Sequence, residues 1–451
     1  MKFIRGQKNQ AQLEALNKEA LAESDAVWAA VAYVSDDRTL LLPCLEQRIP
    51  LRLWARYDYS LPVRVDILRW FLGKSPLCTC KLVPDIFHPK VIWWRSYGVY
   101  IGSANLTDSA WFRNFEAGVF IPDDELDEYE VKPDLEDFFS EVDSASYELT
   151  QEIVQQLEQH NSNPLFRHGN QLAKDFEQAR KIPRLESLSL ISKEKAVSRR
   201  KKEFLKEWSR ALQYIRDIAA RIVVDGVRPA WIPASAPSGA QADQFLHAYY
   251  YNCVMDGHRA RHHEFHEKNR KDPEGALSKA IQWWSRLPSA PSQEDRMINQ
   301  WAPFIAARLK RDRVLSLTEG EFVDVISKVH AFKNYADRAK YTTLGLSKKL
   351  PAMSSEQRSV YLAKRVFQER NAAGEDVRAL LHEVLYGGPV DEVPDRVFDA
   401  AYQPGKRIRH MGLSTFGEIA GWGMPDRYPP RNGRTSKALF ALGYDVVIHT
   451  E

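Results

Sequence analysis

Short apolar runs and amphipathic segments alternate along the first 150 residues. Three runs are rich in valine, leucine, isoleucine and aromatic residues, which favours buried strands: 26–35, 49–58 and 77–85. Segments with apolar residues three and four apart predict helices before or between these runs: 8–23, 40–47 and 63–73. Strands that alternate with helices predict an α/β domain, with a mixed or largely parallel sheet that helices cover on both faces.

The pattern changes near residue 151. A helix is predicted at 149–160, and a polar and basic connection follows it. Beyond this connection, apolar positions recur with helical spacing and strands are scarce. We therefore predict three parts: an α/β domain in 1–150, a helix and basic linker in 151–199, and a mainly α-helical domain in 200–451.

The stretch FHPKVIWWRSYGVYIGSANLT, residues 87–107, predicts a β-hairpin with its turn at 95–98. Residues two apart on a strand share a face, so polar side chains at the two open ends of the hairpin form one cluster. In an antiparallel hairpin with this turn, the numbers of two facing residues sum to about 193. His88 then faces Asn105, and Lys90 faces Ser103.

The side chains of this cluster suit a phosphate. A neutral imidazole is a nucleophile, an ammonium carries a compact positive charge, and hydroxyl and amide groups donate hydrogen bonds. Such groups stabilise a tetrahedral anion better than a carbonyl or a sugar. Downstream, Glu116 begins another apolar strand, where its carboxylate could fix the tautomer of His88. No acidic pair lies within the stretch, so we expect a reaction that uses no metal ion and no other cofactor.

In order and spacing, these residues resemble the active-site signature of the phospholipase D superfamily. That signature pairs His-x-Lys with a downstream Gly-Ser-x-Asn and then Asn-x-Glu. The resemblance covers residues 1–150 and is strongest to the phospholipase D-like nucleases of bacterial restriction and helicase-associated systems. The matching segments here are His88-Pro89-Lys90, Gly102-Ser103-Ala104-Asn105 and Asn114-Phe115-Glu116.

The resemblance implies a phosphodiesterase that cleaves DNA without a metal ion, as a restriction or anti-phage defence nuclease does. His88 would attack phosphorus and form a phosphohistidine, while a second histidine protonates the leaving oxygen. Lys90, Ser103 and Asn105 would hold the non-bridging oxygens, and Glu116 would orient His88. Because the chain has one such motif, the resemblance also implies a homodimer that completes the active site with His88 of both subunits. An ATPase or helicase is a further implied partner.

The chain departs from the family pattern at one position. The family places an aspartate five residues after the lysine, and this chain has Arg95 there. Another His-x-Lys, His266-Glu267-Lys268, lies in a charged run without a downstream Gly-Ser-x-Asn, and we interpret it as a solvated helix or loop. His258, His262 and His266 are spaced four apart, and we expect surface histidines rather than metal ligands.

Composition describes an ordinary globular protein, because 44% of the 451 residues are hydrophobic and 27% are charged. The first residues lack the apolar core of a signal peptide, and no segment is long and apolar enough to cross a membrane. We therefore expect a cytoplasmic protein without a membrane partner. The cysteines lack zinc-site spacing, and we expect buried free thiols in a reducing compartment. They are Cys44, Cys78, Cys80 and Cys253.

Charge is unevenly distributed, although the net charge is only +3. Residues 1–150 hold 16 basic and 24 acidic residues, and the remainder holds 47 and 36. The cationic excess of the second half favours contact with a nucleic-acid backbone. Residues 412–421, GLSTFGEIAG, are loosely similar to the helix–hairpin–helix of DNA glycosylases, whose glycines let backbone amides approach a phosphate. The candidate DNA-binding residues are Arg199, Arg200, Lys201, Lys202, Lys406, Arg407, Arg409, Arg431, Arg434 and Lys437.

Two alternative functions use the same fold. A phospholipase D-type lipid hydrolase would act on lipid headgroups, but an amphipathic membrane-binding segment is not evident in the sequence. A catalytically silent DNA-binding or assembly component would keep the fold without the reaction, and Arg95 favours this alternative. The intact set of candidate catalytic residues favours the nuclease: His88, Lys90, Ser103, Asn105 and Glu116.

Overall fold

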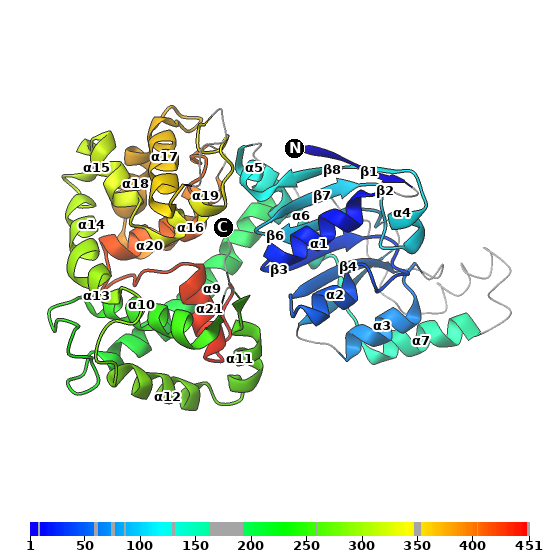
Figure 1. Ribbon diagram of the computed structural model, residues 1–451, viewed down its shortest axis with the longest axis horizontal. Helices are drawn as coiled ribbons and strands as arrows, with labels where there is room; N and C mark the ends of the chain where they lie inside the picture. The colour runs from blue at the N-terminus through cyan, green and yellow to red at the C-terminus, as the bar shows by residue number, and fades with distance from the viewer. Residues whose placement is uncertain are drawn as a thin grey trace. The chain divides into compact units, whose positions relative to one another are not determined.

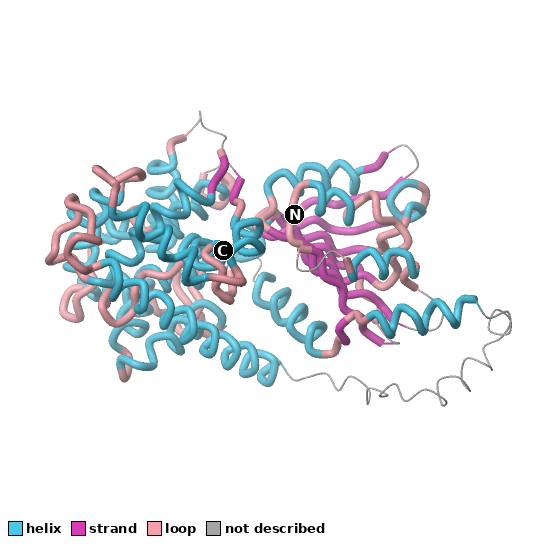
Figure 2. Tube along the Cα trace, turned by 90° about the horizontal axis from the view of Figure 1, so that it is seen from below, coloured by secondary structure: helices cyan, strands magenta, loops and turns pink. Residues whose placement is uncertain are grey.

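A computed structural model of the chain describes residues 1–7, 10–57, 62–73, 77–84, 87–128, 131–162, 193–257, 259–346, 353–403 and 405–448. The predicted basic linker falls largely on 163–192, outside the described residues. The chain divides into two compact units, Met1–Arg200 and Lys201–Glu451. The first is built around a sheet, and the second consists mainly of helices (Figure 1, Figure 2).

The first unit contains a mixed sheet of nine strands in the order β2-β1-β8-β7-β6-β3-β4-β5-β9 (Figure 1). The neighbours β3, β4 and β5 run parallel, and the other neighbouring strands pair antiparallel. The strands are β1 (Lys2–Gln7), β2 (Gln10–Ala11), β3 (Ala26–Val31), β4 (Leu51–Tyr57), β5 (Cys78–Pro84), β6 (Lys90–Arg95), β7 (Gly98–Gly102), β8 (Glu116–Pro122) and β9 (Tyr147–Glu148).

Helices cover both faces of this sheet (Figure 1). On one face, buried side chains come from α1 (Gln12–Glu23), α2 (Leu41–Glu46), α3 (Val65–Leu72), α4 (Asp108–Phe112) and α7 (Gln151–Ser162). On the other face they come from α5 (Asp123–Glu128) and α6 (Val131–Ser144). Because successive residues of a strand point to opposite faces, Leu53 and Ala55 pack with the first group and Trp54 with the second.

The prediction of a mixed sheet covered by helices, followed by a mainly helical region, is confirmed. Three strands of this sheet were missed. β1 reads as a short, half-polar segment whose partner β8 lies far along the chain, and β2 and β9 have two residues each. Cys44, Cys78 and Cys80 are buried free thiols, as predicted, whereas Cys253 is only half-buried.

The predicted hairpin is present, but its register is shifted by one residue. Val91 faces Ile101 and Trp93 faces Val99, so paired positions sum to one less than expected. The shift arises in the turn, where Ser96 has a φ of 71° and Gly98 a φ of 152°. Lys90 is therefore in register with Gly102, and Ser103 follows at a bend just after β7.

Arg95 ends β6, at the opposite end of the strand from Lys90. Its guanidinium lies 4.4 Å from the centre of the Trp93 ring and 4.5 Å from that of Trp28. Arg95 lies five positions after Lys90 along the strand, a distance of about 17 Å. Arg95, the residue that departs from the predicted pattern, therefore makes a cation–π contact inside the sheet and lies far from His88 and Lys90.

Over its described residues, the second unit is helical apart from a small antiparallel pair, β10 (Met255–Asp256) and β11 (Arg259–Ala260) (Figure 2). Its boundary with the first unit falls within α9 (Lys193–Ile222). The other helices are α10 (Ser238–Tyr249), η2 (Tyr250–Val254), α11 (His262–Asn269), α12 (Pro273–Ser285), α13 (Glu294–Arg296), η3 (Met297–Trp301), α14 (Ala302–Arg308), η4 (Val314–Ser316), α15 (Glu319–Ile326), α16 (His330–Arg338), α17 (Ser355–Gln368), α18 (Val377–Tyr386), η5 (Val390–Glu392), α19 (Val393–Tyr402), α20 (Leu413–Gly423) and α21 (Gly433–Ala441). Over the described residues, no helix is both long enough and apolar enough to span a membrane.

The glycines of α20 allow close packing inside this unit. A Cβ at Gly417 would lie 2.7 Å from the carbonyl oxygen of Arg431, and one at Gly421 would lie 2.1 Å from Cα of Pro430. Glu418, between them, accepts hydrogen bonds from the backbone amides of His330 and Ala331 at the start of α16. This segment is therefore part of the core, which argues against phosphate contact through its glycines.

Candidate active site

The candidate site lies at the edge of the first unit's sheet where the strands that carry it begin or end. β3, β4 and β7 end at this edge, and β6 and β8 begin there, because Val31 is in register with Lys90 and Gly102 with Gly118. The side chains that follow or precede these strand ends therefore gather in one place. All five predicted catalytic residues belong to this edge.

His88 and Lys90 are in direct contact. The ammonium of Lys90 lies 2.7 Å from Nδ1 and 3.1 Å from Nε2 of the imidazole, and it donates to the carbonyl oxygen of His88 at 2.9 Å. The His88 side chain is exposed, whereas Lys90 is buried. An ammonium has no acceptor, so this contact requires a neutral imidazole with a free lone pair.

The charges around His88 favour that neutral form. The nearby ammonium of Lys90 is the main cause of a lowered His88 pKa, with smaller contributions from partial burial and from Arg56. Burial also lowers the pKa of Lys90, although the carboxylate of Glu116 opposes this effect. The site therefore pairs an uncharged nucleophile with a cation at neutral pH.

Ser103 and Glu116 form the second part of the site. The Ser103 hydroxyl donates a hydrogen bond to the Glu116 carboxylate and accepts one from the amide of Ala117 at 3.0 Å. The amide group of Asn114 donates to the other Glu116 oxygen at 3.1 Å. Among the described residues, the hydrogen bonds to Glu116 come from Ser103 and Asn114. The predicted hydrogen bond between this carboxylate and His88 is not among them.

Asn105 is fixed by the segment that follows β3. Its amide oxygen accepts a hydrogen bond from the backbone amide of Tyr33 at 3.2 Å, and its carbonyl oxygen accepts one from Trp111 Nε1 at 3.0 Å. Thr107 then caps α4 through a hydrogen bond from Ala110. Because the oxygen of its side chain accepts from Tyr33, Asn105 can donate to a ligand only through its side-chain N–H groups.

Two residues near His88 were missed by the sequence analysis. The ring of Tyr33 lies 6.1 Å from the His88 ring, and Arg56 lies 5.9 Å from the Tyr33 ring. Arg56 also acts electrostatically on both His88 and Lys90. Both residues follow the apolar cores of parallel neighbouring strands, and this is the signal that could have identified them.

The arrangement can bind and attack a phosphate. One exposed imidazole lies near two cations, Lys90 and Arg56, and at the same sheet edge as the side-chain amide of Asn105. The hydroxyl of Ser103 donates its hydrogen to Glu116. Cations and donors of this kind stabilise the charge that develops on non-bridging oxygens during phosphoryl transfer.

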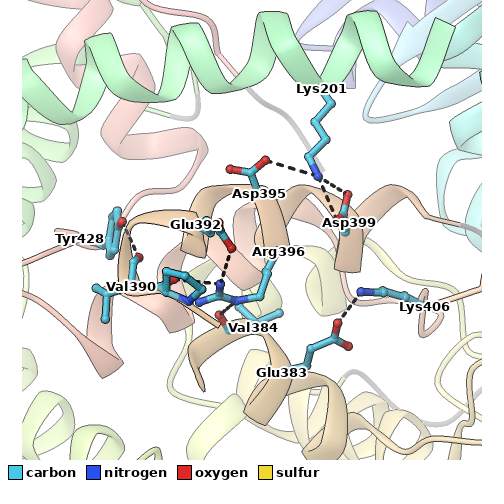
Figure 3. Close-up of polar contacts among 11 residues, drawn as sticks. Lys201, Glu383, Val384, Val390, Glu392, Asp395, Arg396, Asp399, Lys406 and Tyr428 are labelled. Carbon is cyan, nitrogen blue, oxygen red and sulfur yellow. Dashed lines mark hydrogen bonds and ion pairs between the residues drawn. The ribbon is translucent and has the colours of Figure 1, made fainter. Parts of the chain in front are cut away.

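Several predicted DNA-binding residues of the later chain are held in ion pairs. Figure 3 shows Lys201 beside Asp395 and Asp399, at 3.4 and 2.9 Å, and Lys406 beside Glu383. Arg200 pairs with Asp137 at 2.5 Å, and Arg409 with Glu369 at 2.8 Å. These acidic partners partly neutralise the charges that were predicted to face DNA.

Two of the predicted DNA-binding residues are buried, which corrects their assignment. Arg431 is 3% exposed and pairs with Glu207 at 2.5 Å, and Arg434 is 7% exposed beside Tyr251. Lys202 is exposed, and Arg407 and Lys437 are partly exposed. The Arg199 side chain lies outside the described residues, so these four stay predictions.

The predicted surface histidines are also corrected in part. His262 is buried, and the His266 ring stacks on Phe440 with 3.8 Å between ring centres. These two histidines, one helical turn apart, therefore pack against other side chains instead of facing solvent. His258 lies outside the described residues.

Comparison with known proteins gives remote structural likenesses only. No family model matches the chain, and no curated protein matches it. NucT from Helicobacter pylori shares 16% identity over 33% of this chain and 99% of its own, with a TM-score of 0.26. The phospholipase D family member Nuc from Salmonella typhimurium shares 16% identity over 33% of this chain and 97% of its own, with a TM-score of 0.26. Phosphatidylserine synthase from Haemophilus influenzae shares 16% identity over 40% of this chain and 45% of its own, with a TM-score of 0.30. These likenesses do not assign an activity to this chain.

Proposed function

We propose that the chain is a phospholipase D-like phosphodiesterase that cleaves DNA through a phosphohistidine and needs no metal ion. The observation that supports this most directly is the contact of Lys90 with the exposed, neutral imidazole of His88. Ser103, Asn105 and Glu116 at the same sheet edge supply the remaining groups of the motif.

In the first step, a lone pair of the His88 imidazole forms a bond to phosphorus while the bond from phosphorus to the leaving oxygen breaks. The second imidazole, which becomes protonated when the phosphate anion binds beside it, gives its proton to that oxygen. Lys90 and Asn105 hold the non-bridging oxygens, where negative charge accumulates, and Ser103 does so once its hydroxyl turns from Glu116 to the phosphate. In the second step the neutral second imidazole takes a proton from water, whose oxygen displaces His88 and releases the phosphomonoester.

The second imidazole comes, in this proposal, from another copy of the chain. His88 is the one histidine of the first unit whose side chain the structure describes. A two-fold axis beside the site would bring His88 of each subunit to the same phosphate, so that a homodimer forms one active centre.

For the remainder of the chain we propose a role in gripping DNA. Residues 1–150 would form the phosphodiesterase domain, and residues 200–451 would contact DNA or a partner such as an ATPase. Lys202, which is exposed near the start of the second unit, is one cation that such a contact could use. Restriction or anti-phage defence is the biological role that we propose for this combination.

The test is cleavage of supercoiled plasmid in an excess of chelator. Wild-type protein is expected to nick or linearise the plasmid, and His88→Ala to be at least about 10³-fold slower, since it lacks the nucleophile. His382→Ala, which changes a histidine of α18, is the control and should match the wild type. Acid-labile phosphate on the wild type and not on His88→Ala would identify the intermediate.

Other outcomes would replace the proposal. Cleavage that needs magnesium, or that survives His88→Ala, contradicts the mechanism. Hydrolysis of short-chain phosphatidylcholine without action on DNA would indicate the lipid enzyme. Salt-sensitive DNA binding without either reaction would indicate a silent DNA-binding component.

A further inference from the structure

One helix of the second unit contains a turn of wider, π-helical geometry. The segments α13, η3 and α14 follow one another without a break from Glu294 to Arg308, and η3 forms the π-helical turn (Figure 1). Such a turn closes its hydrogen bonds between residues five apart, whereas an α-helix aligns residues three and four apart. Turns of this kind are rare and occur frequently at functional sites.

The π-helical turn brings cations and aromatic rings into one stripe along this helix. Trp301 follows Arg296 by five positions, and Phe304 and Arg308 then follow at intervals of three and four. The Arg296 guanidinium lies 4.6 Å from the centre of the Trp301 ring. The Arg308 guanidinium and the ammonium of Lys328, which follows α15, lie 3.5 and 4.7 Å from the centre of the Phe304 ring. We call these residues the cation–aromatic stripe.

The cations of the stripe are not neutralised by carboxylates. Among the described residues, Arg296, Arg308 and Lys328 form no ion pair. Arg308 donates instead to a carbonyl oxygen of its own helix at 3.3 Å, and Lys328 to that of Asp324 at 2.6 Å. Burial is the main cause of a lowered Lys328 pKa, and the charges of both arginines lower it further, although Asp324 and Glu356 oppose the shift. The like charges of the stripe repel one another, so a bound anion would stabilise them.

The rings of the stripe indicate which polyanion it fits. Trp301 and Phe304 are large aromatic side chains that are only half-buried, and Arg296 is exposed. The bases of a duplex are stacked on one another, so a duplex offers this surface only its phosphates. An unpaired strand offers phosphates and base faces together, and bases stack well on aromatic rings and guanidinium planes. An acidic protein segment would match the cations and leave the rings without a partner.

We infer that the cation–aromatic stripe binds single-stranded DNA. The bases would stack on the pairs Arg296–Trp301 and Arg308–Phe304, and the phosphates would lie against the two arginines and Lys328. This inference rests on the proposed function, which makes DNA the substrate, and it adds that part of this substrate is unpaired. The sequence analysis did not select these residues, because their alignment depends on the π-helical turn and on a cation from another segment.

The test is the binding of a fluorescein-labelled oligothymidylate to the full chain, measured by fluorescence anisotropy. His88→Ala is the parent protein, so that the strand is not cut, and the duplex with oligoadenylate is measured beside it. The single strand is expected to bind at least about 10-fold more tightly than the duplex. Trp301→Ala should weaken binding of the single strand about 10-fold because it loses a stacking surface, and Trp301→Phe should recover most of the affinity.

The cations are tested by the salt dependence of binding, which a merely structural role would not change. Arg296→Gln and Lys328→Gln should each reduce the slope of log affinity against log salt concentration by about 0.7, the effect of losing one phosphate contact with a single strand. Arg286→Gln, at an exposed arginine that follows α12, is the matched control and should keep both slope and affinity. Circular dichroism melting checks that each variant is folded.

Some outcomes overturn the inference. They are equal affinity for duplex and single strand, or binding by Trp301→Ala that matches its parent. Polyglutamate that displaces the strand at equal charge concentration overturns it too, because the stripe would then recognise an acidic protein segment through charge alone.

Other outcomes separate the inference from the proposed function. If wild type cleaves plasmid in chelator and the stripe variants bind the single strand like their parent, the proposed function stands and the inference fails. If wild type cleaves no DNA and the stripe variants lose binding of the single strand, the inference stands and the proposed function fails.

Discussion

The ammonium of Lys90 lies 2.7 Å from Nδ1 of His88, close enough to control the charge of the imidazole. A positive charge at that distance disfavours a second one on the ring, so the pKa of His88 lies below its ordinary value of 6.5. The lysine thus has two effects in the site: it keeps the nucleophile uncharged and it attracts an anion.

The first prediction concerns this pKa. Lys90→Met removes the main cause of the lowered value, so the His88 pKa should rise toward that of a free histidine. Titration of the His88 ring by NMR, assigned with His88→Ala, measures the midpoint in both proteins. An unchanged midpoint in Lys90→Met would show that the ammonium does not act on the ring.

The second prediction concerns the hydroxyl of Ser103. Ser103→Ala removes a hydroxyl that donates to Glu116 and, in the proposed reaction, turns to the phosphate, so the variant should slow phosphodiester cleavage about 100-fold. Ser96→Gly is a matched control, because Ser96 lies at the far turn of the same hairpin with a φ of 71° that glycine adopts easily. Rates are measured on plasmid in chelator. Equal rates in Ser103→Ala and wild type would remove this residue from the mechanism.

The third prediction separates Arg95 from the chemistry. Arg95→Ala loses a guanidinium that is 8% exposed between Trp28 and Trp93, and the free energy of unfolding of the first unit should fall by about 2 kcal/mol. Cleavage per folded molecule should stay within about twofold of wild type, because the strand places Arg95 about 17 Å from Lys90. Denaturant unfolding and the plasmid assay give the two readings, and a selective loss of cleavage would tie Arg95 to the site.

The fourth prediction concerns a buried carboxyl group in the helical unit. Burial, and then the charge of Glu418, raise the pKa of Asp243 to about 7, although Arg434 opposes the shift. Because the folded-state value lies above the unfolded value of 3.8, the stability that Asp243 contributes is full below pH 4 and is lost as the pH rises through 7. Asp243→Asn stays neutral throughout.

The melting temperature of Asp243→Asn should therefore rise relative to wild type between pH 5 and 8.5. Its absolute value can fall at both pH values, since the variant alters the hydrogen bonds from Gln244 and Thr435. The difference between the two proteins cancels other titrating groups, such as His247. A difference independent of pH would mean that Asp243 is ionised across this range.

The fifth prediction concerns the glycines of α20. Gly421→Ala should destabilise the helical unit by about 2 kcal/mol or more, because the new methyl group would meet the backbone of Pro430. Gly320→Ala is the contrasting variant, since nothing lies within 4 Å of its Cβ, and it should stabilise α15 by about 0.5 kcal/mol. Thermal unfolding measures both. A harmless Gly421→Ala would reopen a role of this segment at a surface.

Most of the fold and the candidate site could be predicted from local sequence. The strands β3, β4 and β5 can be predicted because their apolar runs are rich in strand-forming residues. The spacing of His88, Lys90, Ser103 and Asn105 places these four residues at one sheet edge in either register. The register itself depends on how Ser96 and Gly98 close the turn, and their positive φ values are not determined by the apolar pattern. Tyr33 and Arg56 reach the site through strand order, which is a tertiary property.

The charges of the helical unit were harder to predict for a different reason. Lys201 and Arg431 look like free cations in the sequence, but Asp399 and Glu207 meet them from distant segments. Glu418 shows the same limit, since its backbone partners lie at the start of α16. A basic stretch of sequence therefore predicts a basic surface only if one knows which acidic residues from distant segments pair with it.

The two-residue turn between β6 and β7, Ser96 and Tyr97, has a consequence for tolerated change. Adding or removing one residue there would slide β7 against β6 and exchange its two faces, sending Tyr100 toward the side that now holds Val99. The turn is the part of the hairpin farthest from His88. Even so, the number of residues in the turn can vary less than the type of residue found there. Natural variation at this position should therefore take the form of substitution, with insertions and deletions absent.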